Sequence, residues 1–188
     1  MNCDQTGKEE LLALRNCSVE SKQHDSSAVE ESDIEIVSDS LKTEKSSKRL
    51  CACEATVLLA DDNAFNIIAL RDMLKLFEIK CDVAENGKEV VEKFCADQNK
   101  TCCSLRYRLI LTDLDMPVMD GIQAARKVFK LQRKAKSTSA AAPIVAVTAY
   151  DDSTTFYQCK NAGIEAIINK PIGMERLNRI LRQYYQLN

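Results

Sequence analysis

Five short apolar segments, each followed by a segment with helical features, constrain the fold of this chain more than anything else in it. The apolar segments span residues 56–60, 80–84, 108–112, 144–149 and 165–169. Short apolar strands that alternate with helices are typical of a parallel sheet with both faces covered. The pattern therefore predicts an α/β fold, a doubly wound parallel sheet built from five βα units.

The segments between and after the strands carry helix signals. The first has apolar residues at steps of three and four, which predicts a helix with one apolar face. That face would hold Phe65, Ile68, Ala69, Met73, Leu76 and Phe77. Asn86 is the expected N-cap of the second helix, and Asp120 or Gly121 is expected to open the third. Gly163 is expected to end the fourth helix, and Met174 to begin the fifth.

The first fifty residues differ in composition from the rest of the chain. They contain no Phe, Tyr, Trp or Pro, and they carry 11 acidic and 7 basic residues. A segment this poor in large apolar groups buries too little surface to offset the entropy that ordering costs. We therefore expect residues 1–53 to form a disordered polar tail and residues 54–188 to form one domain.

Polar side chains stand where the predicted strands end. Asp61 and Asp62 follow the first strand, Asp113 follows the third, Thr148 lies at the end of the fourth and Lys170 follows the fifth. In a doubly wound sheet, functional groups gather beyond the carboxyl ends of the strands. These residues are therefore expected to share one site.

The chemistry of this set points to phosphoryl transfer. Three neighbouring carboxylates repel one another unless a hard cation such as Mg²⁺ or Mn²⁺ neutralises them. Asp113 would act as the nucleophile and form an aspartyl phosphate. Lys170 and Thr148 would supply an ammonium group and a hydroxyl donor for the phosphoryl oxygens.

Four motifs occur in an informative order. They are Asp61-Asp62, the segment at 113–121 that reads Asp-x-Asp-Met-Pro-x-Met-Asp-Gly, then Thr148-Ala149, then Lys170-Pro171. In this order they resemble the receiver domain of two-component response regulators, over about residues 55–187. The segments 61–66 and 115–121 look most like receivers attached to hybrid histidine kinases.

The resemblance implies a flavodoxin-like fold with strand order 2-1-3-4-5 and assigns roles to the site residues. Asp113 would be the phosphoacceptor and a metal ligand, together with Asp62 and the backbone carbonyl of Asp115. Asp61 would bind the metal through water. Thr148 and Lys170 would be the switch hydroxyl and the ammonium group.

The resemblance also implies details around Lys170. The Lys170-Pro171 peptide bond is expected to be cis. Ile167 stands where the family usually has an aromatic switch residue, so we expect readout through the loop at residues 150–151 rather than through an aromatic rotamer.

As a receiver, the chain would not be a stand-alone kinase. It would phosphorylate itself, with magnesium, from a donor histidine kinase or histidine phosphotransfer protein, and it would also dephosphorylate itself. His24, the only histidine, lies in the polar tail and is expected to be a bystander. Since nothing follows Asn188, output is expected through a downstream protein partner.

Two alternatives remain open. Asp113-x-Asp115 at a strand end also resembles the nucleophile and acid of haloacid-dehalogenase-type phosphatases, although in that family the paired acids come after the Asp-x-Asp. The chain is otherwise compatible with the C-terminal fragment of a hybrid histidine kinase.

Charge and hydropathy indicate where the chain acts. A formal net charge of −2 implies no general attraction to nucleic acid. The sequence has neither an apolar run of membrane-spanning length nor a secretory signal. Nine cysteines without such a signal point to a reducing compartment, so an intracellular, cytoplasmic location is expected.

Four of the cysteines form a possible structural zinc site. Cys51 and Cys53 precede the first strand, and Cys102 and Cys103 precede the third. With strand order 2-1-3-4-5 these strand starts are adjacent, at the end of the sheet opposite Asp113. Four thiolates there would suit Zn²⁺, although both spacings are tighter than is usual.

Overall fold

The computed structural model describes residues 53–134, 141–149 and 152–186. Within them, five parallel strands form one sheet in the order β2-β1-β3-β4-β5, as predicted. The strands are β1 (Val57–Ala60), β2 (Cys81–Ala84), β3 (Leu109–Thr112), β4 (Ile144–Thr148) and β5 (Ala166–Asn169). The predicted tail, except for residue 53, lies outside the described residues, and so do His24 and the loop at 150–151.

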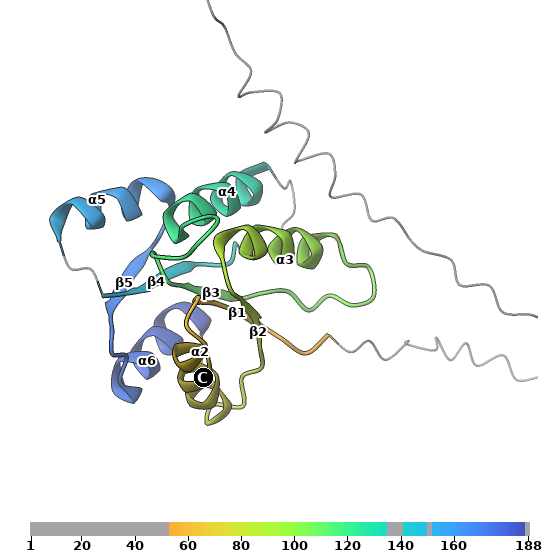
Figure 1. Cartoon of the computed structure of the whole chain (residues 1–188). Helices are drawn as coiled ribbons and strands as arrows, with labels where there is room; N and C mark the ends of the chain where they lie inside the picture. The colour runs from red at the N-terminus through yellow and green to blue at the C-terminus, as the bar shows by residue number, and fades with distance from the viewer. Residues whose placement is uncertain (1–52, 135–140, 150–151, 187–188) are drawn as a thin grey trace, which may run out of the picture. The chain divides into compact units, whose positions relative to one another are not determined.

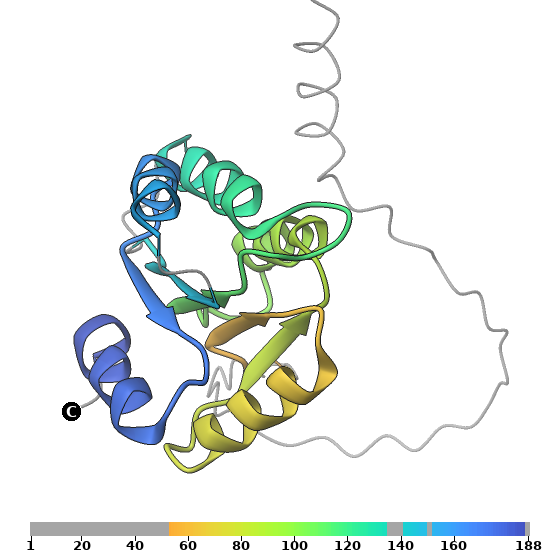
Figure 2. The ribbon, with the colours of Figure 1, turned by 60° about the vertical axis from the view of Figure 1, so that its left-hand side comes forward.

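Helices cover both faces of the sheet (Figures 1 and 2). One face carries α3 (Gly87–Asn99), α4 (Gly121–Lys134) and α5 (Ser153–Ala162). The other carries α2 (Ala64–Lys75) and α6 (Met174–Ile180), which continues as the short π-helix η1 (Leu181–Tyr185). The doubly wound α/β architecture is therefore confirmed. None of the helices in the described part of the chain is long and apolar enough to cross a membrane.

The central strands are buried on both faces, and alternate residues serve different cores. In β1, Leu58 packs with the α3, α4 and α5 side, whereas Leu59 packs with the α2 and α6 side. Every residue of β1, β3 and β4 is buried. This explains why these strands read as uninterrupted apolar runs.

The predicted helix boundaries are largely confirmed. The Asn86 side chain accepts a hydrogen bond from the Glu89 N–H at 3.0 Å, which caps α3. Gly163 ends α5 with φ +87°, a left-handed conformation that favours glycine. α4 begins at Gly121 and α6 at Met174.

The predicted apolar face of the first helix was wrong. The residues of α2 that are buried are Ile67, Leu70 and Leu74, whereas Phe65 is 82% exposed and Leu76 is 74% exposed. Ile68 and Ala69 are exposed too, and only Met73 and Phe77 of the predicted face pack partly against the core. The helix instead buries the stripe of Ile67, Leu70 and Leu74, and Asn66, next to Ile67, donates hydrogen bonds to the buried Asp61.

Candidate functional site

Strand register brings the predicted site residues together. Ala60 of β1 pairs with Thr112 of β3, so the residues that follow them, Asp61 and Asp113, leave the sheet side by side. Thr148 of β4 pairs with Asn169 of β5, and the next residue, Lys170, donates its N–H to the Thr148 carbonyl at 2.8 Å. Backbone pairing thus places Asp61, Asp113, Thr148 and Lys170 at the same edge of the sheet, as expected.

Lys170 bridges the two buried carboxylates. Its Nζ lies 2.7 Å from Oδ2 of Asp61 and 2.6 Å from Oδ2 of Asp113. Asp61 is 1% exposed and Asp113 is 7% exposed, so both depend on the protein for solvation of their charge. The hydrogen bonds from Lys170, and for Asp61 also those from Asn66, replace the lost water.

Burial and neighbouring charges shift the pKa values of both Asp113 and Lys170. Burial raises the pKa of Asp113, and although the hydrogen bond and the charge of Lys170 lower it, the net shift is upward. Burial by itself would lower the pKa of Lys170, but the hydrogen bonds and charges of Asp113 and Asp61 outweigh burial and raise it. Lys170 is therefore held as an ammonium ion against the carboxylates.

The three predicted acidic residues also lie close enough together to share a metal ion. Asp61, Asp62 and Asp113 each offer a carboxylate oxygen, and these oxygens all lie within 4.8 Å of one another. Asp62 is exposed, and both Asp62 and Asp115 line the groove over Asp113. A set of hard oxygen donors fits Mg²⁺ or Mn²⁺ better than a soft metal ion.

A surface groove gives access to Asp113. Its lining consists of Asp62, Asn63, Asn66, Asp113, Asp115, Met116, Pro117, Thr148, Ala149 and Lys170. Asp61 is not in the lining, because it lies beneath the groove and is held by Asn66 and Lys170. The groove therefore presents the nucleophile, the hydroxyl-bearing residue Thr148 and the ammonium group to an incoming phosphoryl group.

The loop that follows Asp113 is held in place by backbone contacts. The Leu114 N–H donates to Oδ1 of Asp113 at 2.7 Å, and the Gly121 N–H donates to the Leu114 carbonyl at 3.0 Å. A Cβ on Gly121 would lie only 2.0 Å from the carbonyl oxygen of Asp113. Gly121 therefore has a structural role in positioning Asp113. Sequence reasoning missed this role, although the Asp120-Gly121 pair was its visible signal.

Two other contributions were missed by sequence reasoning. Asn66 stabilises Asp61 directly, and its only signal was its place in the segment 61–66. Val118 adopts φ +67°, and the Met119 N–H donates to the Pro117 carbonyl at 2.7 Å. This is a tight three-residue turn, strained at its central residue, and no local sequence rule assigns it to a valine.

The structure describes some of the features predicted around Lys170. The Lys170-Pro171 bond is cis, which confirms that prediction. Ile167 is partly buried against the α3, α4 and α5 side of the core. The predicted readout through residues 150–151 stays a prediction, since these residues lie outside the described part of the chain.

Three of the four predicted zinc ligands are also brought together. The sulfur atoms of Cys53, Cys102 and Cys103 lie within 4.8 Å of one another. Cys51 lies outside the described residues.

Comparison with known sequences points to one family. A family model for the response regulator receiver domain matches residues 57–182. The peroxide stress-activated histidine kinase mak1 of Schizosaccharomyces pombe is 33% identical over 126 residues, which cover 67% of this chain and 7% of that kinase. Two-component response regulator 24 of Arabidopsis thaliana is 31% identical over 134 residues, which cover 71% of this chain and 86% of that protein. This chain thus corresponds to a small part of the kinases it resembles, 7% of mak1 and 6% of the related mak3.

Solved structures share the fold. The receiver domain of sensor histidine kinase PA1611 from Pseudomonas aeruginosa, crystallised with a magnesium ion in its active site cleft, is 26% identical. It aligns with a TM-score of 0.57 over 72% of this chain and all of that domain. The receiver domain of Saccharomyces cerevisiae Ssk1, solved with the phosphotransfer protein Ypd1, aligns with a TM-score of 0.60 at 24% identity, over 70% of this chain and 88% of that one. Since the family match runs from β1 into the last helix and includes Asp113, Thr148 and Lys170, the chain belongs to the family of response regulator receiver domains.

Proposed function

We propose that this chain accepts a phosphoryl group on Asp113 from a phosphohistidine and thereby switches a surface that binds a partner protein. Residues 54–188 would make up the receiver domain. The donor would be a histidine kinase or a histidine phosphotransfer protein. One observation carries the proposal: a buried carboxylate at a strand end, open to a groove, bridged by Lys170 and flanked by two further carboxylates.

The transfer step needs positioning and charge more than covalent assistance. A carboxylate oxygen of Asp113 forms a bond to phosphorus while the bond from phosphorus to the donor imidazole nitrogen breaks. The histidine leaves with the electron pair of that bond. Asp113 is held for this attack by the Leu114 N–H and by the pairing of its own N–H with the Ala60 carbonyl at 2.8 Å.

The carboxylates fit a divalent cation beside Asp113. Asp62, Asp113 and the backbone carbonyl of Asp115 would hold Mg²⁺ or Mn²⁺ directly, and Asp61 would hold it through water. When bound, the cation supplies charge that offsets the carboxylates and the phosphoryl oxygens. Lys170 contributes a second positive charge, already within 2.6 Å of Oδ2 of Asp113.

Phosphorylation would be read out through Thr148. This residue is fully buried at the end of β4 and also lines the groove over Asp113. A phosphoryl group on Asp113 offers new acceptor oxygens to the Thr148 hydroxyl, which biases the loop that follows β4 toward one of two arrangements. A downstream protein would bind that loop and its surroundings.

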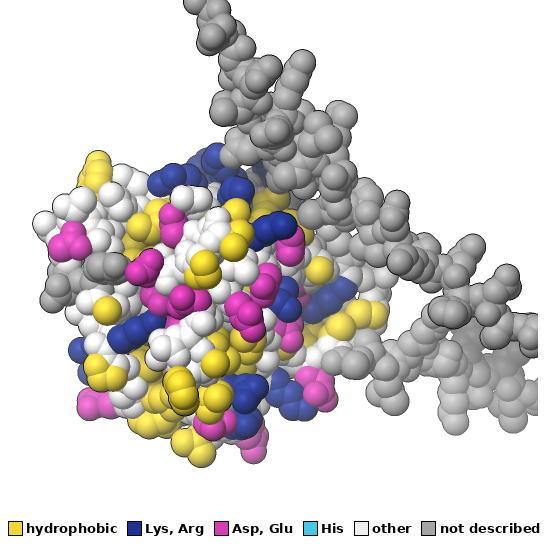
Figure 3. All heavy atoms as spheres, viewed as in Figure 1, with side chains coloured by type: hydrophobic (Ala, Val, Ile, Leu, Met, Phe, Trp, Pro, Cys, Tyr) yellow, Lys and Arg dark blue, Asp and Glu magenta, His cyan; other side chains and the backbone are white. Residues whose placement is uncertain are grey.

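An exposed apolar surface at the start of α2 suits a protein donor. Phe65 is 82% exposed and Ile68 is 46% exposed, and both follow Asp62 within six residues. Hydrophobic side chains gather over α2 on the face shown in Figure 3. Exposed large apolar groups beside a reactive site mark an interaction surface. A phosphohistidine domain docked on this surface would bring its imidazole to Asp113.

The decisive experiment measures phosphorylation of Asp113. The chain is incubated with a small phosphodonor such as acetyl phosphate, with and without Mg²⁺, and the acyl phosphate is detected as a base-labile, acid-stable modification. We expect one site of labelling that requires the divalent cation and disappears on chelation. Autodephosphorylation is followed in the same sample after the donor is removed.

Three variants sharpen this experiment. Asp113→Asn should abolish labelling, and Asp62→Ala should remove most of it by weakening the metal site. Asp72→Ala removes an exposed carboxylate on α2 that pairs with Lys75 and does not line the groove over Asp113, and it should label normally. Label that persists in Asp113→Asn contradicts the proposal. Rapid hydrolysis of a small phosphoester would instead favour the phosphatase alternative.

A further inference from the structure

Three cysteines meet at the end of the sheet opposite Asp113. Cys53 precedes β1, and Cys102 and Cys103 lie in the loop that leads into β3. Because β1 and β3 are adjacent and parallel, the segments before them enter the sheet side by side. Residues 49 positions apart therefore place their sulfur atoms in one cluster.

The distances within the cluster match a thiolate metal site. Sγ of Cys53 lies 3.4 Å from Sγ of Cys102, which lies 4.0 Å from Sγ of Cys103. Zinc–sulfur bonds of about 2.3 Å in a tetrahedron place two sulfur atoms about 3.8 Å apart. A disulfide would need about 2.05 Å, so the sulfur atoms stand at ligand spacing rather than bonding distance.

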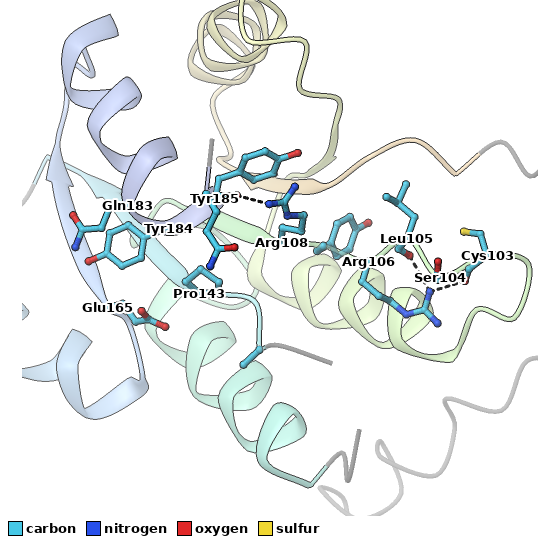
Figure 4. A pocket seen from close by; sticks show the side chains of 13 residues that line it. Cys103, Ser104, Leu105, Arg106, Arg108, Pro143, Glu165, Gln183, Tyr184 and Tyr185 are labelled. Carbon is cyan, nitrogen blue, oxygen red and sulfur yellow. Dashed lines mark hydrogen bonds between the residues drawn. The ribbon is translucent and has the colours of Figure 1, made fainter. Parts of the chain in front are cut away.

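The loop that carries two of these thiols is held in position. The guanidinium group of Arg106 donates to the carbonyls of Lys100, Cys103 and Leu105 at 2.8, 2.9 and 2.8 Å. Figure 4 shows Arg106 folded back on the backbone beside Cys103 and Leu105. At the end of the loop, the Tyr107 N–H donates to Oδ2 of the buried Asp97 at 3.1 Å.

This anchoring matters because a metal site is tight when its ligands are already placed. A loop fixed at several carbonyls loses little entropy when its thiols bind an ion. Cys102 is exposed and Cys53 and Cys103 are partly buried, so an ion can reach the cluster.

We propose that Cys53, Cys102 and Cys103 bind Zn²⁺ and thereby fasten the segment before β1 to the loop before β3. Each thiol that binds releases its proton to solvent as the zinc–sulfur bond forms. Three sulfur ligands leave one tetrahedral position open on the ion. The site is separate from the carboxylates around Asp113.

The test uses the full chain, purified with a reductant and without added chelator. Metal content is measured by mass spectrometry, and thiol-bound zinc is released by mercuribenzoate and quantified with a chromogenic chelator. Cobalt replaces zinc in a second sample, since thiolate ligation to Co²⁺ gives a sulfur-to-metal charge-transfer absorption. We expect about one zinc per chain and this absorption band.

Single substitutions identify the ligands. Cys53→Ser, Cys102→Ser and Cys103→Ser should each weaken zinc binding by more than the roughly 10- to 100-fold that loss of an outer partner costs. Cys81→Ser is the matched control, because Cys81 is also partly buried, lies at the start of β2 and does not belong to the cluster. Cys81→Ser should bind zinc as the parent chain does. Asp113→Asn should also keep its zinc, which separates this site from the phosphoacceptor.

Several outcomes overturn the proposal. They are a chain that binds no zinc at micromolar concentration, a cobalt sample without the charge-transfer band, and an unchanged affinity in Cys102→Ser. Because Cys102 is exposed, its serine variant should fold, and circular dichroism verifies this. A Cys53–Cys102 disulfide that persists in the presence of the reductant, in place of bound metal, would equally refute the assignment.

Discussion

Replacement of Gly121 by alanine should displace the phosphoacceptor without touching any side chain of the site. The added Cβ would lie 2.0 Å from the carbonyl oxygen of Asp113, 2.9 Å from its carbonyl carbon and 3.0 Å from Cα of Leu114. All three atoms belong to the backbone, so no side-chain rotation relieves the contact. The backbone on either side must separate by on the order of 1 Å to restore normal contact distances.

The cost of this movement follows from what holds the two segments together. Gly121 donates to the Leu114 carbonyl at 3.0 Å, and Asp113 donates to the Ala60 carbonyl at 2.8 Å, so separation strains paired backbone. Overpacking a tight site costs about 1–3 kcal/mol, and backbone contacts place this case near the upper end. The higher helix propensity of alanine returns at most about 1 kcal/mol. We expect a net loss of about 2 kcal/mol in the free energy of unfolding.

Two measurements follow from the same displacement. Urea denaturation should show the loss of stability as a lower midpoint with an unchanged slope. The rate of phosphorylation by acetyl phosphate should fall by up to about 100-fold, because a misplacement of about 1 Å in a reacting group has effects of that size. The rate is measured on the folded fraction, well below the denaturation midpoint.

Gly173→Ala is the matched control. No heavy atom lies within 4 Å of a Cβ at this position, and its backbone, with φ −94°, suits alanine. This variant should lose less than about 1 kcal/mol, the cost of a poorer helix N-cap, and keep its phosphorylation rate. If Gly121→Ala is as stable and as reactive as Gly173→Ala, the close approach at Gly121 does not position Asp113.

Two further predictions concern the donor surface and the strained turn. Phe65→Ser should slow phosphotransfer from a phosphorylated histidine phosphotransfer protein about tenfold or more, as loss of an apolar anchor does, while leaving phosphorylation by acetyl phosphate unchanged. Phe156→Ser on α5, where Phe156 is 61% exposed, is its control, and equal slowing with both donors would exclude a docking role. Val118→Gly should raise the free energy of unfolding by about 0.5–1 kcal/mol. The conformation at φ +67° costs a β-branched residue about 1–2 kcal/mol, and the greater entropy that glycine loses on folding offsets part of the gain from relieving it. Val118→Ala keeps the strained φ, so its free energy of unfolding should rise less. Both variants are measured by urea denaturation, and a glycine variant less stable than the parent chain would argue against strain at Val118.

The positions of the strands could be predicted closely because burial in a parallel sheet requires a recognisable sequence pattern. A strand covered on both faces must be apolar throughout, and β1, β3 and β4 are. The edge strand β2 has exposed and partly buried residues, and it was still predicted, with the helix cap Asn86 two residues beyond its end. Strand ends then located Asp61, Asp113 and Lys170 without any knowledge of tertiary contacts.

What the sequence did not reveal depends on distances between backbone segments. The need for glycine at 121 arises only because the start of α4 lies against the backbone of Asp113 and Leu114, and the φ of Val118 belongs to the tight turn at residues 117–119. Residue identity indicates such contacts only weakly. A glycine can occur in a sequence for many structural reasons, and no local sequence rule predicts a positive φ at a valine.

The error in α2 has a different origin and says something about function. A helix with two overlapping apolar stripes satisfies the same periodicity in two rotations, and hydrophobicity alone does not choose between them. In the structure the stripe of Ile67, Leu70 and Leu74 faces the core, and Asn66, next to Ile67, donates to the buried Asp61. Phe65 and Ile68 are then left facing solvent next to Asp62. Asn66 holds the buried Asp61 of the acidic site through two hydrogen bonds, so Asn66→Ala should slow phosphorylation by acetyl phosphate relative to the parent chain.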